Sequence, residues 1–410
     1  MTDSLKNTLT LSDAVRLVKP LRYNVMIKIV GAMCNLNCHY CYYIDKSRFY
    51  DGNHIMPLNL LEKLIKEYIE TNEADEVVFN WHGGEPLIAG LEYYKNVVKI
   101  QKKHSANKKI LNTLQTNATL LNDDFASFFK DNDFLLGVSI DGPQDIHDKY
   151  RIDKNGSPTF EKVIKGIELL HRYKVDFNTM TTINKASEGR GSDVYLFLKQ
   201  IGSHYMQFMP VVEYVDENNR IVPPGTYNSK VATWSVGATA YGQFMCDIFD
   251  FWVRNDVGSY FVNLFDSVLA NYCSVECGCC AYAETCGLNA VVEHNGDVYP
   301  CDHYVYPNYI MGNIAEKSIY EIVSSDMMSR FGIDKRNKLP KRCLRCDSLF
   351  VCHGECPKHR FNKTDIGEDG LSYLCDGYRL FYSYVKPYML TMRDLLLENR
   401  SPSEIMRMTI

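Results

Sequence analysis

Apolar and polar residues between positions 23 and 211 follow two alternating patterns. Short β-like runs alternate with longer segments in which apolar residues recur every three or four positions, as expected for strands and amphipathic helices. We predict strands at 23–30, 76–82, 109–116, 134–141, 176–183 and 205–211. We predict helices near 57–72, 91–105, 122–131, 159–174 and 192–201. Such βα repeats indicate a parallel sheet with right-handed crossovers.

The number of repeats predicts an α/β fold built on a partial, TIM-like (β/α)6 barrel. Six units rather than eight are expected to leave one side of the barrel open. In barrels of this kind, reactive groups gather at the carboxyl ends of the strands. Residues that directly follow each predicted strand are therefore the first candidates for a site.

The pattern changes after residue 211. Residues 211–230 are polar and turn-rich, which indicates a loop. Residues 239–270 look helical, and their aromatic side chains are expected to pack in a core, with a peptide groove as the alternative. A closing helix is expected at 376–399. We divide the chain into a partial barrel, a helical connection, a cysteine-rich domain, and a C-terminal helix with its tail, at 1–235, 236–272, 273–385 and 386–410.

Composition restricts the partners. The chain has 45 basic and 50 acidic residues and a formal net charge of -5, with no long basic run, so nucleic acid is not expected as a partner. No stretch approaches the roughly 18 apolar residues of a membrane span, so no membrane is expected either. Residues 1–19 resemble neither a signal peptide nor a transit peptide. These features predict a cytoplasmic protein.

The fifteen cysteines of the chain are clustered. Three lie at 34–41, eleven lie at 273–375, and Cys246 stands apart. A disulfide framework is typical of short secreted chains, whereas clustered thiols in a reducing compartment more often hold metal. The cysteines therefore predict metal centres.

Cys34, Cys38 and Cys41 form a CxxxCxxC motif directly after the first predicted strand. Three thiolates can hold three irons of a 4Fe-4S cluster, which normally takes four cysteine ligands, and so leave one iron open to a substrate. A zinc site is the alternative, although zinc motifs usually pair CxxC units with further Cys or His. The sequence GGEP at 83–86 follows the second strand, where glycines let backbone carbonyls approach a cation closely.

The downstream cysteines supply enough thiols for two fully ligated 4Fe-4S clusters, with two zinc sites as the alternative. The expected ligands are Cys280, Cys286, Cys301, Cys343, Cys346, Cys352, Cys356 and Cys375. Their spacing does not decide how they divide between two centres. The remaining thiols are expected to be small buried apolar residues, and they are Cys246, Cys273, Cys277 and Cys279.

The CxxxCxxC motif, with aromatic Tyr40 before its last cysteine, and the GGEP segment resemble the radical S-adenosylmethionine superfamily. The resemblance implies that the open iron chelates S-adenosylmethionine and that GGEP receives its methionyl amino group. Ser139 lies at the end of the fourth strand and Arg151 follows it, at places where related enzymes contact the ribose and the carboxylate, and a guanidinium suits a carboxylate. The full set of expected cofactor contacts is Tyr40, Gly83, Gly84, Glu85, Gln115, Ser139 and Arg151.

The second cysteine region resembles the SPASM domain, which carries auxiliary iron–sulfur clusters beside radical barrels. The resemblance implies one cluster on Cys280, Cys286, Cys301 and Cys356. It implies another on Cys343, Cys346, Cys352 and Cys375. The chain is thus expected to carry three 4Fe-4S clusters and S-adenosylmethionine.

Four stretches, at 81–90, 202–213, 301–307 and 339–361, are similar to anaerobic sulfatase-maturating enzymes, and the likeness extends over about residues 22–380. This implies oxidation of a Cys or Ser in a CxPxR-like sulfatase motif to Cα-formylglycine. A 5′-deoxyadenosyl radical would take the Cβ hydrogen, Asp302 would be the general base, and an auxiliary cluster would accept an electron. The implied partners are an unfolded or nascent sulfatase segment and an electron donor such as flavodoxin or ferredoxin.

Two alternatives remain at this point. A SPASM maturase that forms thioether or carbon–carbon crosslinks in a ribosomal peptide would share the clusters and GGEP. A zinc-binding interaction protein would use the same cysteines structurally.

Overall fold

A computed structural model describes residues 22–50, 55–223, 226 and 229–409. The expectation drawn from residues 1–19 lies outside the described residues. The centre of the fold is a ten-stranded sheet in the order β12-β11-β10-β1-β2-β3-β4-β5-β6-β9. Six consecutive parallel strands form the predicted barrel, and they are β1 (Asn24–Lys28), β2 (Glu76–His82), β3 (Lys109–Thr116), β4 (Phe134–Ser139), β5 (Phe177–Ile183) and β6 (Tyr205–Pro210). All six predicted strands are confirmed.

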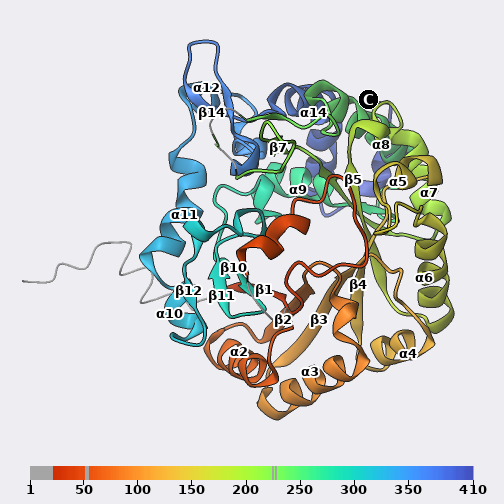
Figure 1. The fold of residues 1–410 in the computed structure, drawn as a ribbon. Coiled ribbons are helices and arrows are strands. Elements are labelled where there is room, and N and C mark those ends of the chain that lie inside the picture. The colour runs from red at the N-terminus through yellow and green to blue at the C-terminus, as the bar shows by residue number, and fades with distance from the viewer. Residues whose placement is uncertain (1–21, 51–54, 224–225, 227–228, 410) are drawn as a thin grey trace, which may run out of the picture.

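Helices follow one another around the outside of the curved sheet (Figure 1). The five predicted ones are α2 (Leu58–Thr71), α3 (Leu91–His104), α4 (Asp123–Asp131), α6 (Phe160–Tyr173) and α7 (Gly191–Gln200). Helix α4 begins where the Asn122 side chain accepts a hydrogen bond from the Phe125 amide at 2.9 Å, which satisfies an otherwise unpaired donor. The short helix α5 (Gln144–Tyr150) was not predicted.

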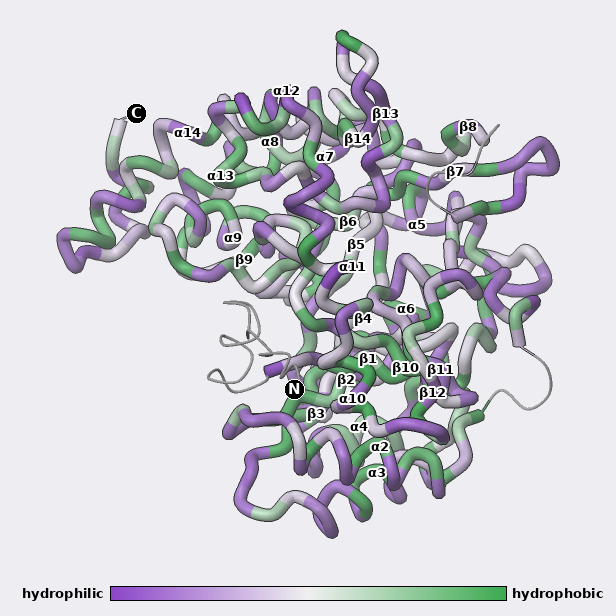
Figure 2. The backbone as a smooth tube through the Cα atoms, turned by 90° about the vertical axis from the view of Figure 1, so that its left-hand side faces the viewer, coloured by the Kyte–Doolittle hydropathy of each residue, from purple (hydrophilic) through white to green (hydrophobic). Residues whose placement is uncertain are grey.

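Burial alternates along the barrel strands. In β2, Val77, Phe79 and Trp81 are buried against the helices, whereas Asn80 and His82 are only half-buried and belong to the opposite face of the sheet. One face of the strand therefore builds the core, and the other is available to line the barrel interior. In Figure 2, hydrophobic residues lie at β1 and β10, and the residues of the loop beyond β7 are hydrophilic.

The sheet extends beyond the predicted barrel at both edges. Strand β9 (Phe261–Val262) pairs in parallel with β6, and β10 (Asn289–Glu293) pairs in parallel with β1. Strands β11 (Asp297–Tyr299) and β12 (Gly312–Asn313) continue the second edge in antiparallel orientation. The cysteine-rich region thus contributes strands to the same sheet as the barrel.

The predicted helical region 239–270 is two helices, α8 (Ala238–Asn255) and α9 (Asn263–Tyr272). Gly258, with φ +83°, turns the chain between them. The aromatic residues Phe244, Phe249 and Trp252 are at most 3% exposed, so the core prediction is confirmed for them. The closing helix α14 (Cys375–Leu397) packs against α8 and begins before residue 386. The boundary expected at 385/386 falls inside this helix, and the four-part division stays a prediction.

The remaining elements are short and connect these layers. They are η1 (Ile44–Phe49), η2 (Pro86–Ala89), η3 (Lys185–Ser187), β7 (Tyr214–Val215), β8 (Lys230–Val231), η4 (Cys280–Tyr282), η5 (Asp302–Tyr304), η6 (Pro307–Tyr309), α10 (Ile319–Val323), α11 (Asp326–Asn337), α12 (Lys341–Leu344), α13 (Leu349–Cys352), η7 (Pro357–His359), β13 (Asn362–Lys363), β14 (Asp369–Leu371) and η8 (Pro402–Arg407).

Candidate active site

The loop after β1 carries the three cysteines expected to hold the radical cluster. The Cys34 sulfur accepts hydrogen bonds from the Leu36 amide at 3.4 Å and from the Asn117 side chain at 3.8 Å. Cys34 and Cys41 lie close enough to Cys38 to raise its pKa, after burial, which is the larger cause. Burial also raises the pKa of Cys34 and Cys41 to about 11, so these thiols would release protons on binding metal.

The GGEP segment packs directly on this loop. The Gly84 amide donates to the Gly31 carbonyl at 2.7 Å, and the Glu85 amide donates to the Met33 carbonyl at 2.8 Å. A Cβ on Gly84 would lie 2.1 Å from the Met33 carbonyl oxygen, so this position admits no side chain. The first two strand ends are thereby joined through backbone contacts.

Glu85 is fully buried, and its side chain serves the scaffold. Its carboxyl oxygens accept hydrogen bonds from the Asn117 amide at 2.7 Å, from Thr116 Oγ1 at 2.8 Å and from the Leu87 amide at 3.0 Å. Burial raises the pKa of Glu85 to about 7. The backbone at Gly83 and Gly84 is left for the expected contact with the cofactor.

Tyr40 and Arg151 meet on a residue that was not predicted, Asp141. The Tyr40 hydroxyl donates to Asp141 Oδ2, and Arg151 Nε lies 3.0 Å from Asp141 Oδ1. Asp141 is fully buried and is the last residue of the fourth predicted strand, and this place at a strand end is the signal that could have found it. Nearby, Gln115 Nε2 donates to Ser139 Oγ at 2.9 Å. Gln115 and Ser139 thus meet at neighbouring strand ends, and Tyr40 and Arg151 are joined through Asp141.

Asp302 begins η5 and reaches the end of β1. Its Oδ1 lies 2.5 Å from the Lys28 ammonium, and its Oδ2 accepts a hydrogen bond from the Tyr42 hydroxyl. Burial opposes ionisation of Asp302, but the adjacent Lys28 ammonium outweighs it and the pKa of this carboxyl is held well below its usual range. The candidate base is thus an ionised carboxylate with both oxygens engaged.

The eight downstream cysteines form two groups, within which neighbouring thiols raise one another's pKa. One group is Cys280, Cys286, Cys301 and Cys356. The other group is Cys343, Cys346, Cys352 and Cys375. This is the division that the resemblance to SPASM domains implies, although the ligand roles themselves stay a prediction.

The surroundings of the first group fit a cluster. Its four sulfur-bearing residues line a cavity of about 310 Å³ that also reaches Asp302 and the barrel residues Met26 and Gln207. The Lys335 ammonium, 1% exposed, donates to the carbonyl oxygens of Cys280 and Ala281 at 2.5 and 2.9 Å and fixes that loop. Among the described residues no three His, Cys, Asp or Glu converge on a point suited to one ion. A four-iron cluster has no such need, because each thiolate binds a different iron.

Of the other four cysteines, Cys277 and Cys279 lie close enough to Cys280 to interact with it electrostatically, and Cys279 lines the same cavity. All fifteen thiols of the chain are free. Cys246 and Cys277 are buried, as expected for small apolar residues, whereas Cys273 and Cys279 are half-buried.

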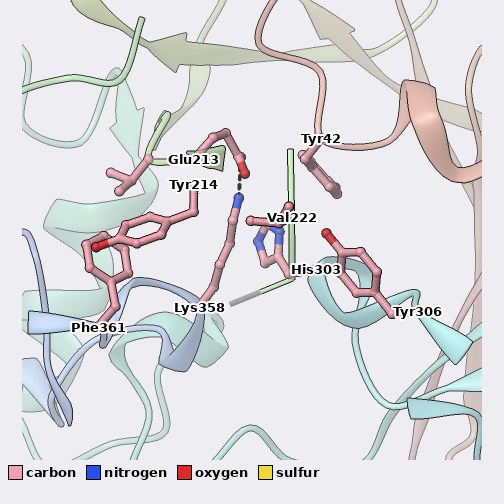
Figure 3. Close-up of a pocket in the computed structure, with 9 residues that line it drawn as sticks. Tyr42, Glu213, Tyr214, Val222, His303, Tyr306, Lys358 and Phe361 are labelled. Atoms are coloured by element: carbon pink, nitrogen blue, oxygen red, sulfur yellow. Dashed lines mark hydrogen bonds and ion pairs between the residues drawn. The ribbon is translucent and has the colours of Figure 1, made fainter. Parts of the chain in front are cut away.

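A small pocket is lined by Tyr42 and by His303, the residue that follows Asp302 in the chain (Figure 3). Lys358 lies in η7, two residues after Cys356. Its ammonium group donates a hydrogen bond to Glu213, in the loop after β6. The Lys358 ammonium also lies 4.8 Å from the centroid of the Tyr42 ring. Sequence reasoning did not single out Glu213 or Lys358, although both lie in stretches that carry the family resemblance.

Comparison with known proteins identifies both halves of the chain. Residues 29–195 match the radical SAM superfamily, and residues 280–347 match SPASM, an iron-sulfur cluster-binding domain. The cofactors of the protein are accordingly S-adenosylmethionine and 4Fe-4S clusters, with auxiliary clusters in the SPASM domain. No described helix has the length and apolar character needed to cross a membrane.

Individual relatives cover almost the whole chain. A serine-type anaerobic sulfatase-maturating enzyme of Bacteroides thetaiotaomicron is 45% identical over 395 residues, 95% of either chain. A cysteine-type enzyme of Clostridium novyi is 32% identical and covers 88% of this chain and 94% of its own. The structure of native anSMEcpe with bound AdoMet and Cp18Cys peptide matches with a TM-score of 0.81 and 31% identity, covering 92% of this chain and all of that one. The chain belongs to the anaerobic sulfatase-maturating enzymes of the radical SAM superfamily.

Proposed function

We propose that the protein oxidises a serine or cysteine side chain in a CxPxR-like motif of a sulfatase polypeptide to Cα-formylglycine. The observation that carries the proposal is the 45% identity to a serine-type maturating enzyme along 95% of both chains. Other serine-type relatives are 31–32% identical, as the cysteine-type enzyme is, so both serine and cysteine are kept as targets. These relatives also favour formylglycine formation over peptide crosslinking, and the iron-sulfur family match favours clusters over zinc.

We assign each cluster to one of the three groups of cysteines. Cys34, Cys38 and Cys41 would hold the cluster that binds S-adenosylmethionine, and the two downstream groups would hold auxiliary clusters. When loaded, these groups would supply a hydrogen-abstracting 5′-deoxyadenosyl radical and a one-electron oxidant. The backbone of Gly83 and Gly84, the Ser139–Gln115 pair and Arg151 are proposed to orient the cofactor at the barrel mouth.

Asp302 is proposed to take the proton of the substrate hydroxyl or thiol. Its carboxylate is kept ionised, so it is in the state that a base requires. A low pKa makes it a weak base. This suffices because a hydroxyl beside a carbon radical is far more acidic than the hydroxyl of serine itself.

The oxidation also defines the partners. An unfolded or nascent sulfatase segment is the proposed substrate, and a reduced flavodoxin or ferredoxin is the proposed electron donor. Free thiols throughout the chain support a reducing, cytoplasmic setting.

The activity is tested by anaerobic incubation of cluster-reconstituted protein with S-adenosylmethionine, a reductant and serine or cysteine versions of a CxPxR peptide. Formylglycine, detected by mass spectrometry and aldehyde trapping together with 5′-deoxyadenosine, is the expected result. Deoxyadenosine without any peptide change would disprove the assigned reaction and leave the radical chemistry.

Replacing the candidate base separates the two half-reactions. Asp302→Asn should lower formylglycine formation by at least about 100-fold while cleavage of S-adenosylmethionine continues, because an amide replaces the carboxylate that takes the substrate proton. The matched control is Asp247→Asn, on α8 away from the site. Retained formylglycine in Asp302→Asn would remove the assignment.

A further inference from the structure

A buried lysine connects the candidate base to the strand that precedes GGEP. Lys28 ends β1, and its side chain is fully buried. Its ammonium lies 2.5 Å from Asp302 Oδ1, 3.0 Å from His82 Nδ1 and 4.1 Å from the centroid of the Tyr43 ring. One cation therefore contacts three segments that are far apart in the sequence.

His82, the contact of Lys28 on β2, is suited to accept a hydrogen bond from an ammonium group. Burial lowers the pKa of His82 to about 4, so its ring is neutral. Two donors face the same ring nitrogen, because His82 Nδ1 lies 2.9 Å from the Gly83 amide and 3.0 Å from the Lys28 ammonium. Lys28 can therefore donate to His82 and to Asp302 at the same time.

The fully buried carboxylate of Glu293, on the neighbouring strand β10, also interacts electrostatically with Lys28, so part of the role of this cation is charge compensation. A buried ion pair costs desolvation that its attraction repays only in good geometry, and apolar replacement of such pairs is often neutral or stabilising. Lys28 also provides orientation. With Lys28 on Oδ1 and Tyr42 on Oδ2, the Asp302 carboxylate cannot rotate without losing a contact.

We propose that Lys28 is a positioning residue for the oxidation, which fixes the Asp302 carboxylate relative to the His82–Gly84 segment. This inference rests on the proposed function, because it assumes that Asp302 receives the substrate proton. In this arrangement the ammonium group of Lys28 sets the distance between Asp302 and the expected cofactor contacts. A proton acceptor that is misplaced by a fraction of its hydrogen-bond length loses much of its effect.

The test compares two substitutions in the reconstituted full chain. Lys28→Met keeps an unbranched side chain and removes the charge, whereas Lys28→Arg keeps a cationic donor. The control is Lys199→Met, which removes an ion-paired lysine from α7, 2.7 Å from Asp256. Iron content, deoxyadenosine and formylglycine are measured with the serine and cysteine peptides.

Lys28→Met should bind iron and cleave S-adenosylmethionine as the wild type does. On the serine peptide, its ratio of formylglycine to deoxyadenosine should be at least about tenfold lower than that of the wild type. The loss should be smaller on the cysteine peptide, since a thiol gives up its proton more easily than a hydroxyl, and Lys28→Arg should recover part of the ratio. A purely structural residue would affect both peptides equally.

Two results would overturn the inference while the proposed function stands. One is a wild-type ratio in Lys28→Met on both peptides. The other is loss of bound iron in Lys28→Met with normal Lys28→Arg, which would show a structural role. Wild-type protein that forms no formylglycine would overturn the proposed function and the inference with it.

Discussion

Gly84 lies where two backbone segments meet at the mouth of the barrel. There is no room for a methyl group between it and the Met33 carbonyl. Gly84→Ala should therefore destabilise the fold by roughly 1–3 kcal/mol and suppress cleavage of S-adenosylmethionine, since the cysteine loop must move. Chemical denaturation and deoxyadenosine assays measure the two effects. Gly278→Ala is the control, because nothing lies within 4 Å of a Cβ at that position, and equal behaviour of both variants would contradict the prediction.

Lys46 gives the stability of the protein a pH dependence. Burial lowers its pKa to about 7 from 10.5, despite attraction from Asp302 and Glu213. Between these values the unfolded chain binds more protons than the folded one, so this residue makes stability rise with pH over that range. Lys46→Met should lose that rise.

Thermal unfolding at about pH 7 and about pH 9 measures this difference. As the pH is raised, the melting temperature of the wild type should increase relative to that of Lys46→Met. A constant difference between the two proteins would show that Lys46 is charged throughout.

Residues whose chemistry is local could be predicted from sequence, and residues defined by distant contacts could not. Cys34, Cys38 and Cys41 form a motif within one loop. Tyr42 and Asp302 are 260 positions apart, and Lys28 has no neighbour in sequence that hints at its ion pair. The resemblance supplied Asp302 as a candidate, but not the lysine and tyrosine that hold it.

At the scale of elements, length decided what could be predicted. The six barrel strands have five to eight residues, enough for a periodic pattern, and each was found within three residues of its ends. Strands β9 and β12 have two residues and carry no period. The break between α8 and α9 was missed because apolar and aromatic residues continue through it.

The contact between α8 and α14 depends on two facing glycines. A Cβ on Gly242 would lie 2.3 Å from the Gly377 carbonyl oxygen, and one on Gly377 would lie 1.9 Å from the Ala238 carbonyl oxygen. Gly to Ala usually stabilises a helix by up to about 1 kcal/mol. Here Gly242→Ala should instead destabilise the protein by roughly 1–3 kcal/mol, because the helices must separate. Denaturant titration against Thr239→Ala, an exposed site in the first turn of α8, tests this sign; a more stable Gly242→Ala would refute it.

At the scale of the whole molecule, the barrel and the SPASM region share one sheet. Strand β10 pairs with β1 along five residues, so the site that joins Lys28 to Asp302 lies across this junction. Pairing between segments that are more than 200 residues apart leaves no local pattern. It was therefore not predictable, whereas the parallel barrel itself was.

Removing single thiols should separate the three clusters. Cys301→Ala and Cys343→Ala should each lose about four irons and keep reductive cleavage of S-adenosylmethionine, because the first cluster has its own ligands. Cys38→Ala should lose that cleavage while retaining the iron of the other two centres. Iron analysis and deoxyadenosine assays distinguish these cases, with Cys246→Ala as the control that should change neither. Loss of all iron in any one variant would mean that the centres assemble cooperatively.

The position of Cys375 at the first turn of α14 has a consequence for synthesis of the chain. The thiols at 34–41 leave the ribosome early, but the second downstream group lacks its fourth member until α14 has been made. That helix then settles on α8 through the close glycine contact. On the proposed ligand set, cluster insertion into this centre therefore waits until Cys375 has been made, and Cys343, Cys346 and Cys352 stay reduced thiols until then.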